Sequence, residues 1–288
     1  MGVKNRNTGK RLMAAIFCVS FIGIALMGFL YFEFVSKTVY EESVSHLTEV
    51  FHQSDTMLKE LANKNLTYLH MWGEYLQDTS GEREIRDYIE KAQEEAGFLY
   101  FYFLSADGNY KTAAGETGYL GLQENLADEI WQGNDIITNA AVPGQSQMLV
   151  FASPESHGSY QGFEYDAIAI AYENTDIVDV LDISAFDGNA KSYVVHPDGR
   201  VVVDRSFESW GNAYNFFGVL REHSDISEKE ILALSEKFKQ GHTDAMMVNL
   251  DGEDYYLVYE KSDIQDWMFL GLVQADIVNA SMNKLQLS

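Results

Sequence analysis

Cysteine and proline are nearly missing from this sequence. Among 288 residues there is one cysteine, Cys18, and there are three prolines. A single thiol excludes an intrachain disulfide and a metal centre built from cysteines. So few prolines exclude a proline-rich linker or stalk. The chain nevertheless has 46% hydrophobic and 13% aromatic residues. It can therefore bury a core, and it is long enough for one long or two small domains.

Basic residues are scarce as well. The chain has 20 Lys and Arg against 44 Asp and Glu, a net charge of −24. Four of the basic residues but only one acidic residue precede residue 35, so residues 35–288 carry 16 basic and 43 acidic side chains. A surface this acidic repels polyanions, which excludes nucleic acid as a partner. We interpret the acidity itself as a contribution to solubility.

The common catalytic motifs are absent too. There is no Walker A loop, no G-x-G-x-x-G and no H-E-x-x-H sequence. Residues 144–148 begin like a nucleophile elbow but lack the closing glycine. Asp107, Asp198 and Asp251 each precede a glycine, but EF-hand spacing is missing and turn formation explains them better. Residues 1–288 are therefore predicted not to be an enzyme, and to hold neither a cofactor nor a metal.

Residues 12–32 form a run of 21 residues without a formal charge. As a helix, this run is long enough to span the hydrocarbon core of a bilayer, about 30 Å. Four basic residues stand before it, and positive flanks stay in the cytoplasm. We therefore expect a cytoplasmic N-terminus over residues 1–11, a transmembrane helix over 12–34 in the cell membrane, and an extracytoplasmic chain over 35–288. A cleaved signal peptide is the alternative, but the run is too long and no Ala-x-Ala follows it.

The segment after this run is predicted to continue as one long helix over residues 35–78. It has no proline, and its first glycine is Gly73. Ser43, Ser54 and Asn65 interrupt its apolar stripe, so a uniform coiled coil is unfavourable. We expect the stripe to pack on its own domain and, nearer the membrane, on a second copy in a homodimer. The apolar residues that recur at helical spacing are Val35, Val39, Leu47, Val50, Leu58, Leu61, Leu69, Trp72 and Leu76.

A strand–turn–strand pattern occurs twice after this helix. Residues 98–104 lead into Asp107-Gly108, and residues 191–196 lead into Asp198-Gly199, 91 residues later. Asp-Gly between apolar runs is typical of a β-hairpin. Each copy ends in an Asp-Ile-Val triplet, and the two triplets lie 100 residues apart. An internal duplication is the simplest explanation.

The duplication predicts two modules, over residues 79–185 and 186–276, followed by a C-terminal helix over 277–288. Helices are expected over about 82–96, opened by Ser80, and over 122–131 and 227–240. Besides the two hairpins, strands are expected at 147–152, 166–172, 245–249, 255–260 and 267–273.

This architecture resembles the double Cache sensor domain over residues 35–280. The likeness lies in the strand–Asp-Gly–strand openings and in segments such as HPDGRVVVD and DWMFLGLVQADIV. The resemblance implies an α+β fold, in which an N-terminal transmembrane helix continues into a long stalk helix and is followed by two PAS-like modules. Each module would be an antiparallel sheet flanked by helices. It further implies a second transmembrane helix after residue 288 and a cytoplasmic output domain.

Domains of this kind are the sensors of bacterial histidine kinases, diguanylate cyclases and chemoreceptors. The resemblance implies that the chain binds a small-molecule ligand in the first, membrane-distal module and signals across the membrane. We favour the sensor of a histidine kinase in a two-component system. The sensor of a diguanylate cyclase or chemoreceptor remains an alternative, as does a surface-anchored binding protein without output.

The candidate ligand residues come from the first module. Tyr100 and Tyr102 alternate along one strand, so both face the same side. The Arg-x-Trp-Tyr cluster of amino-acid-binding members is absent, and Lys111 is the one basic residue between Ala92 and Ala190, against sixteen acidic residues. This balance favours a cationic, neutral or sugar-like ligand. The predicted ligand-binding residues are Tyr100, Tyr102, Lys111, Trp131, Tyr165 and Asp166.

Overall fold

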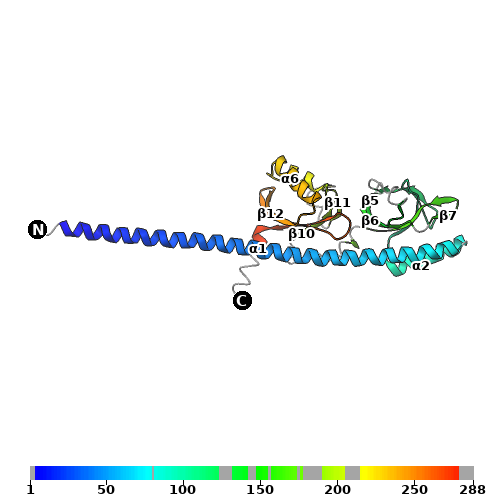
Figure 1. Ribbon diagram of the computed structural model, residues 1–288, viewed down its shortest axis with the longest axis horizontal. Helices are drawn as coiled ribbons and strands as arrows, with labels where there is room; N and C mark the ends of the chain where they lie inside the picture. Colours follow the sequence, from blue (N-terminus) through cyan, green and yellow to red (C-terminus); the bar gives the residue numbers. More distant parts are fainter. Residues whose placement is uncertain are drawn as a thin grey trace.

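Two modules lie side by side along one long helix, α1 (Figure 1). The computed structural model describes residues 4–79, 81–122, 132–141, 147–154, 157–173, 176–177, 190–204 and 215–278. The module nearer the N-terminal end of α1 is here the proximal module, residues 190–278. The other is the distal module, residues 82–173.

Helix α1 runs from Lys4 to Asp78, 75 residues, which confirms the expected long helix and places its start before residue 35. It passes along both modules, and its N-terminal part extends well beyond them (Figure 1). Large apolar side chains between Phe17 and Phe34 are exposed. In the part of the chain that the structure describes, no helix is both long and apolar enough to cross a membrane. The transmembrane helix over residues 12–34 stays a prediction.

The distal module is built on a seven-stranded antiparallel sheet in the order β3-β2-β1-β9-β6-β5-β4. Helix α2 (Glu82–Ala96) precedes the sheet and has the predicted bounds. A two-stranded hairpin of β7 (Gly158–Tyr160) and β8 (Phe163–Tyr165) leads into β9. The strands of the main sheet are β1 (Tyr100–Leu104), β2 (Asn109–Thr112), β3 (Thr117–Tyr119), β4 (Gly121–Leu122), β5 (Ile136–Ala141), β6 (Gln147–Ser153) and β9 (Ala167–Glu173).

The proximal module has a five-stranded antiparallel sheet in the order β11-β10-β14-β13-β12. Two helices, α5 (Phe216–His223) and α6 (Glu228–Lys239), connect β11 with β12. The hydroxyl of Ser227 and the side chain of Glu230 form a capping box that begins α6. The strands are β10 (Lys191–Val195), β11 (Val201–Asp204), β12 (Asp244–Leu250), β13 (Glu253–Lys261) and β14 (Met268–Gln274).

The two sheets share one topology. Strands β2-β1-β9-β6-β5 of the distal sheet correspond in order to β11-β10-β14-β13-β12 of the proximal sheet. The registers correspond as well, because Tyr102 lies opposite Ala169 on β9 and Tyr193, 91 residues later, lies opposite Leu270 on β14. The structure therefore confirms the internal duplication that the sequence predicts.

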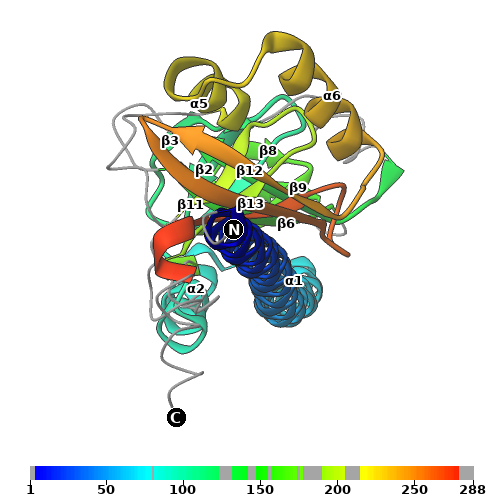
Figure 2. The same cartoon turned by 90° about the vertical axis from the view of Figure 1, so that its left-hand side faces the viewer.

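Each sheet has an inner face, which packs on α1, and an outer face on the other side. Inner-face residues of both sheets form one hydrophobic cluster with α1 and α2, including Phe101 and Ile170 in the distal module and Val258 and Phe269 in the proximal one. Figure 2, a view along α1, shows α1 and α2 on one side of the sheets and α5 and α6 on the other. The proximal outer face forms a separate cluster with α5 and α6.

Polar groups on α1 are buried against the modules. Asn65 is fully buried, and its Oδ1 accepts a hydrogen bond from the hydroxyl of Tyr172 on β9, 2.9 Å away. Ser54, 2% exposed, donates to the carbonyl oxygen of Val50 within the helix. These two interruptions of the stripe therefore lie in the contact with the sheets. The homodimer contact stays a prediction.

Some expected boundaries differ from the structure. Gly81 is the N-cap of α2 and has no side-chain capping bond, while Ser80, predicted to open this helix, lies outside the described residues. Leu122 belongs to strand β4, so the helix predicted over 122–131 does not begin there. The border between the modules near residue 185 also falls outside the described residues. Of the C-terminal helix predicted over 277–288, the structure describes only residues 277 and 278, and both are helical. Helix α5 and strands β3, β4, β5, β7 and β8 were not predicted.

Candidate functional site

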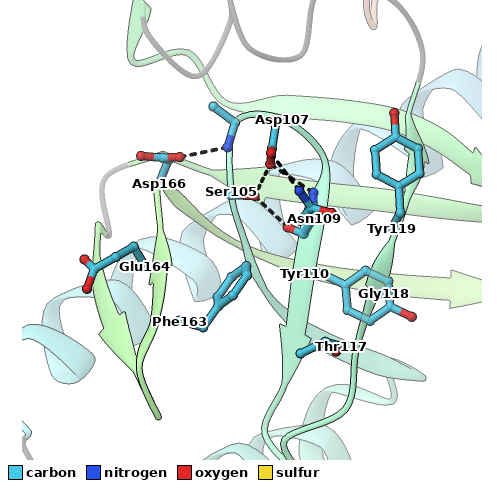
Figure 3. Close-up of a pocket in the computed structure, with 11 residues that line it drawn as sticks. Ser105, Asp107, Asn109, Tyr110, Thr117, Gly118, Tyr119, Phe163, Glu164 and Asp166 are labelled. Carbon is cyan, nitrogen blue, oxygen red and sulfur yellow. Dashed lines mark hydrogen bonds between the residues drawn. The ribbon is translucent and has the colours of Figure 1, made fainter.

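A depression of about 890 Å³ opens on the distal module. The turn between β1 and β2 forms one wall, and β3 and the β7–β8 hairpin form the others (Figure 3). Three aromatic rings line it, those of Tyr110, Tyr119 and Phe163. The depression also contains three carboxylates, which belong to Asp107, Glu164 and Asp166.

Two of these carboxylates are held in place by the turn. Oδ2 of Asp166 accepts a hydrogen bond from the backbone N–H of Ala106 at 2.8 Å, which ties the β1–β2 turn to the start of β9. The carboxylate of Asp107 accepts hydrogen bonds from the hydroxyl of Ser105 and from the backbone and side-chain nitrogens of Asn109 (Figure 3). Carboxylates held in this way can face a ligand without further ordering.

The depression is negatively charged at neutral pH. The hydrogen bond from Ser105, followed by the backbone N–H of Asn109, lowers the pKa of Asp107 below its ordinary value of 3.8. None of the described residues that line the depression is Lys, Arg or His. A cationic ligand therefore meets favourable charges here, and an anionic ligand does not.

A series of three tyrosine rings leads from the depression into the module. The ring of Tyr110 lies 4.6 Å from that of Tyr102, measured between centroids, and Tyr102 stacks on Tyr100 at 5.7 Å. Tyr102 is 2% exposed, and its burial raises the pKa of its hydroxyl well above the ordinary value of 10.0. Its hydroxyl lies 4.0 Å from Sδ of Met148. The series thus connects the charged depression with the outer face of the sheet.

The central strand of the distal sheet, β9, presents small side chains on its outer face. Strand β9 alternates between the two faces, with Ala167, Ala169 and Ala171 on the outer face and larger residues on the inner face. Ala152 on β6 lies directly opposite Ala169. Of the helices whose bounds the structure gives, α1 and α2 lie on the inner side of this sheet. Tyr102 on β1 lies opposite Ala169 and is thus the large neighbour of this alanine in the adjacent strand.

The corresponding face of the proximal module is filled. Leu270 occupies the place of Ala169, with Met268 and Leu272 on either side of it along β14. Tyr259 lies opposite Leu270 where Ala152 lies opposite Ala169. Helices α5 and α6 add further aromatic and aliphatic side chains to this cluster. Both outer faces are therefore buried apolar clusters, but the central strand carries alanines in the distal module and larger residues in the proximal one.

The six predicted ligand residues separate into groups. Tyr100 and Tyr102 lie together, and Asp166 lies in the depression that Tyr110 connects to them. Lys111 is elsewhere, with its Nζ donating to the carbonyl oxygen of Gln161 at 2.9 Å. Tyr165 is 7% exposed in the inner core, where its ring lies 5.0 Å from that of Phe103. Trp131 lies outside the described residues. Their roles as ligand contacts stay predictions.

Tyr110 and the alanines of β9 were not among the predicted ligand residues. Tyr110 follows the predicted turn, and a hairpin places it beside Tyr102. The contact between these two rings could therefore have been predicted from the sequence. The alanines were visible as an alternation of Ala with larger residues in AIAIAYE, residues 167–173. Tyr100 also borders a smaller cleft, of about 240 Å³, which Arg86 and Gln93 of α2 line from the other side.

Comparisons with known proteins support the fold. No family model and no curated protein sequence matches the chain. Among solved structures, the extracellular domain of mmHK1S-Z3, described as a histidine kinase, has a TM-score of 0.58 at 14% identity, covering 86% of this chain and 99% of that one. The sensory domain of the Campylobacter jejuni chemoreceptor Tlp3, solved with isoleucine, has a TM-score of 0.52 at 10% identity and covers 85% of this chain and 98% of that one.

A third similar structure is the ligand-binding domain of the Pseudomonas aeruginosa PAO1 chemoreceptor PctB in complex with L-Arg. Its TM-score is 0.55 at 14% identity, over 82% of this chain and 97% of that one. The chain thus has the α+β fold of extracellular sensory domains of histidine kinases and chemoreceptors, in agreement with its resemblance to double Cache domains.

Proposed function

We propose that residues 35–288 are the extracytoplasmic ligand-sensing region of a bacterial membrane receptor, with the ligand site in the distal module. One observation carries this proposal. The outer face has alanines at 167, 169 and 171 in the distal module, where the proximal module has Met268, Leu270 and Leu272. Of two modules with one strand order, the module with the smaller side chains on this face is the better candidate for binding a ligand.

The ligand that fits best is an organic cation or a neutral molecule with an amine. Carboxylates of Asp166 and Glu164 can pair with an ammonium group, and the ring of Tyr110 offers a cation–π contact. Tyr100 and Tyr102 extend the contact surface toward the alanines. Among the similar structures, PctB was solved with L-Arg, a ligand with a cationic side chain. The proposal keeps Tyr100, Tyr102 and Asp166 as ligand contacts and adds Tyr110.

The receptor would be anchored by residues 12–34, with the N-terminus in the cytoplasm. The support is the uncharged run over 12–32, the basic residues before it, and the exposed apolar side chains between Phe17 and Phe34 on α1. The last described residues, 275–278, lie beside α1 on the side of the proximal module that faces its N-terminal part (Figure 1). A chain that returns to this side suits a second membrane helix after residue 288.

The proposed output is a histidine kinase, as for the mmHK1S-Z3 domain, with a chemoreceptor as the second candidate because Tlp3 and PctB share the fold. A surface-anchored binding protein without output would share the same sensor fold. The reading frame beyond residue 288 separates these possibilities. An apolar span followed by a kinase core is the expected result, and a stop codon directly after residue 288 would contradict the proposal of a signalling receptor.

The ligand site is tested by calorimetric titration of the chain with amines identified in a thermal-shift screen. Asp166→Asn keeps the shape and an oxygen that can accept from Ala106, but it removes the negative charge. Loss of a charge-assisted hydrogen bond should weaken an amine about 10- to 100-fold. Glu94→Gln, an exposed carboxylate of α2, is the matched control and should bind as the parent does. If the parent and Asp166→Asn bound the amine with equal affinity, the depression would not be the ligand site.

A further inference from the structure

The contact between α1 and the proximal module contains a carboxylate that is fully hydrogen-bonded. Asp55 is 9% exposed on α1. It accepts hydrogen bonds from the hydroxyl of Ser262 and from the backbone N–H of Asp263, whose nitrogen lies 3.2 Å from both carboxylate oxygens. Lys59, one turn further along α1, donates to Asp263 at 3.1 Å. These contacts fasten α1 to the segment that follows β13.

A second carboxylate lies next to this fastening. On β13, Tyr256 and Val258 belong to the inner core with α1, and Glu260 continues the same alternation toward Ser262. Glu260 is half-buried, and its Oε2 is shielded from solvent without a hydrogen-bond partner among the described residues. An acid inside a packed contact, next to the fastening of Asp55, is a costly arrangement when it is ionised.

The groups around Glu260 are mostly negative. Asp55 and His52 face it from α1, and Asp263 faces it from the segment after β13. On the side of β14, its strand neighbour is Phe269, which is apolar. Burial is the main cause that raises the pKa of Glu260 above its ordinary value of 4.5; His52 opposes the rise, and Asp55 and Asp263 add to it.

We propose that this contact is an acid-responsive element, in which proton uptake by the carboxylate of Glu260 tightens the docking of α1 on the proximal module. The proton neutralises a buried negative charge beside Asp55, so the repulsion across the contact disappears. It also turns Glu260 into a hydrogen-bond donor that can reach a neighbouring acceptor. The stimulus would be acidity outside the membrane, and it would act on α1 without a ligand in the distal module.

The direction of the effect follows from the raised pKa. The protonated form of Glu260 is favoured in the docked state more than in an undocked one. Its contribution to docking is therefore complete at pH below 4.5 and is lost as the pH rises through the higher pKa of the docked state. Acidic medium should hold α1 in one position, and neutral medium should allow a broader range of positions.

Spin-label distances in the full chain test this proposal. Labels at Glu49 on α1 and Lys239 at the end of α6, both exposed, are introduced into a Cys18→Ser chain reconstituted in bilayer discs. The parent should show a narrower distance distribution at about pH 4 than at about pH 7.5. Glu260→Gln, which imitates the protonated acid, should show the narrow distribution at both values. Glu222→Gln, an exposed acid of α5, should respond to pH as the parent does.

A second variant guards against a folding defect of Glu260→Gln. His52 opposes the rise of the Glu260 pKa when it is charged, so His52→Gln should move the transition to higher pH. An unchanged distribution of the parent between the two pH values would overturn the proposal. A pH response that survives in Glu260→Gln, or a transition that His52→Gln leaves in place, would overturn it as well. None of these three outcomes bears on the ligand site of the distal module.

Discussion

The two modules of this chain have the same strand order and register, but the side chains on the outer face of the sheet differ in size. In the proximal module, Leu270 and Tyr259 face each other across β14 and β13, and α5 and α6 cover them. In the distal module, Ala169 and Ala152 occupy the corresponding places on β9 and β6. The inner faces are alike, because both pack large residues on α1. The two modules are thus alike on the face that packs on α1 and differ on the outer face, where we propose that the distal module binds its ligand.

The largest expected effect is on the stability of the proximal core. Leu270 is fully buried, so Leu270→Ala should cost about 2–5 kcal/mol of unfolding free energy, because a cavity remains among α5, α6 and β13. Denaturant unfolding of the chain measures this. Ala169→Gly, at the matching distal place, removes a single methyl group and is the control with a much smaller loss. A cost below about 1 kcal/mol for Leu270→Ala would mean that the proximal outer face is not a packed core.

An intermediate effect is expected where α1 approaches the proximal sheet. A Cβ added at Gly271 would lie 2.4 Å from Cζ of Phe51, so Gly271→Ala forces the helix or the ring to shift. The expected cost is about 1–3 kcal/mol in the same unfolding measurement. Gly218→Ala is the matched control, since a Cβ added there would lie 4.0 Å from Cβ of Asn215 and no clash results. Equal stabilities of the two variants would show that α1 does not press on β14.

The smallest effect concerns the distal contact of α1. Tyr172→Phe removes the hydrogen bond to Asn65 and should cost about 1 kcal/mol, because the buried Oδ1 of Asn65 loses its donor. Tyr172 has a pKa of about 12, raised first by burial, so it stays neutral and the cost should be the same at about pH 5 and pH 7.5. This pH independence contrasts with the carboxylates at the proximal contact. If the loss of unfolding free energy in Tyr172→Phe changed with pH over this range, the distal contact of α1 would not differ from the proximal one in its response to pH.

Much of this fold was predictable from the sequence because the repeat supplied two readings of each pattern. A clear hydrophobic period or a helix cap, such as Ser227 before α6, marks most of the predicted elements. These elements are β6, β9, β12, β13, β14, α2 and α6. Strands β7 and β8 have three residues each, which is too few to recognise an alternation of apolar and polar residues. Helix α5 has only 8 residues and contains Gly218, so a helical period is hard to recognise in its sequence.

The site was predictable in part. Alternation alone placed Tyr100 and Tyr102 on one face, which their stacked rings confirm as a geometric prediction. The neighbourhood of Asp166 was not predictable, because its partner is the backbone N–H of Ala106, 60 residues earlier, and such a contact has no signature in the sequence. That the alanines of β9 correspond to larger residues of β14 becomes clear only when the registers of the two sheets are compared.

The most direct test of the claim that the distal module, and not the proximal one, binds the ligand is hydrogen–deuterium exchange of the full chain. The exchange is measured with and without a saturating amine found in the thermal-shift screen. We predict that the ligand slows exchange in β1, in the turn at residues 105–109 and in β9, while α5, α6 and β14 exchange at unchanged rates. Protection centred on α5, α6 or the outer strands of the proximal module would contradict the account, because the packed module would then be the one that binds.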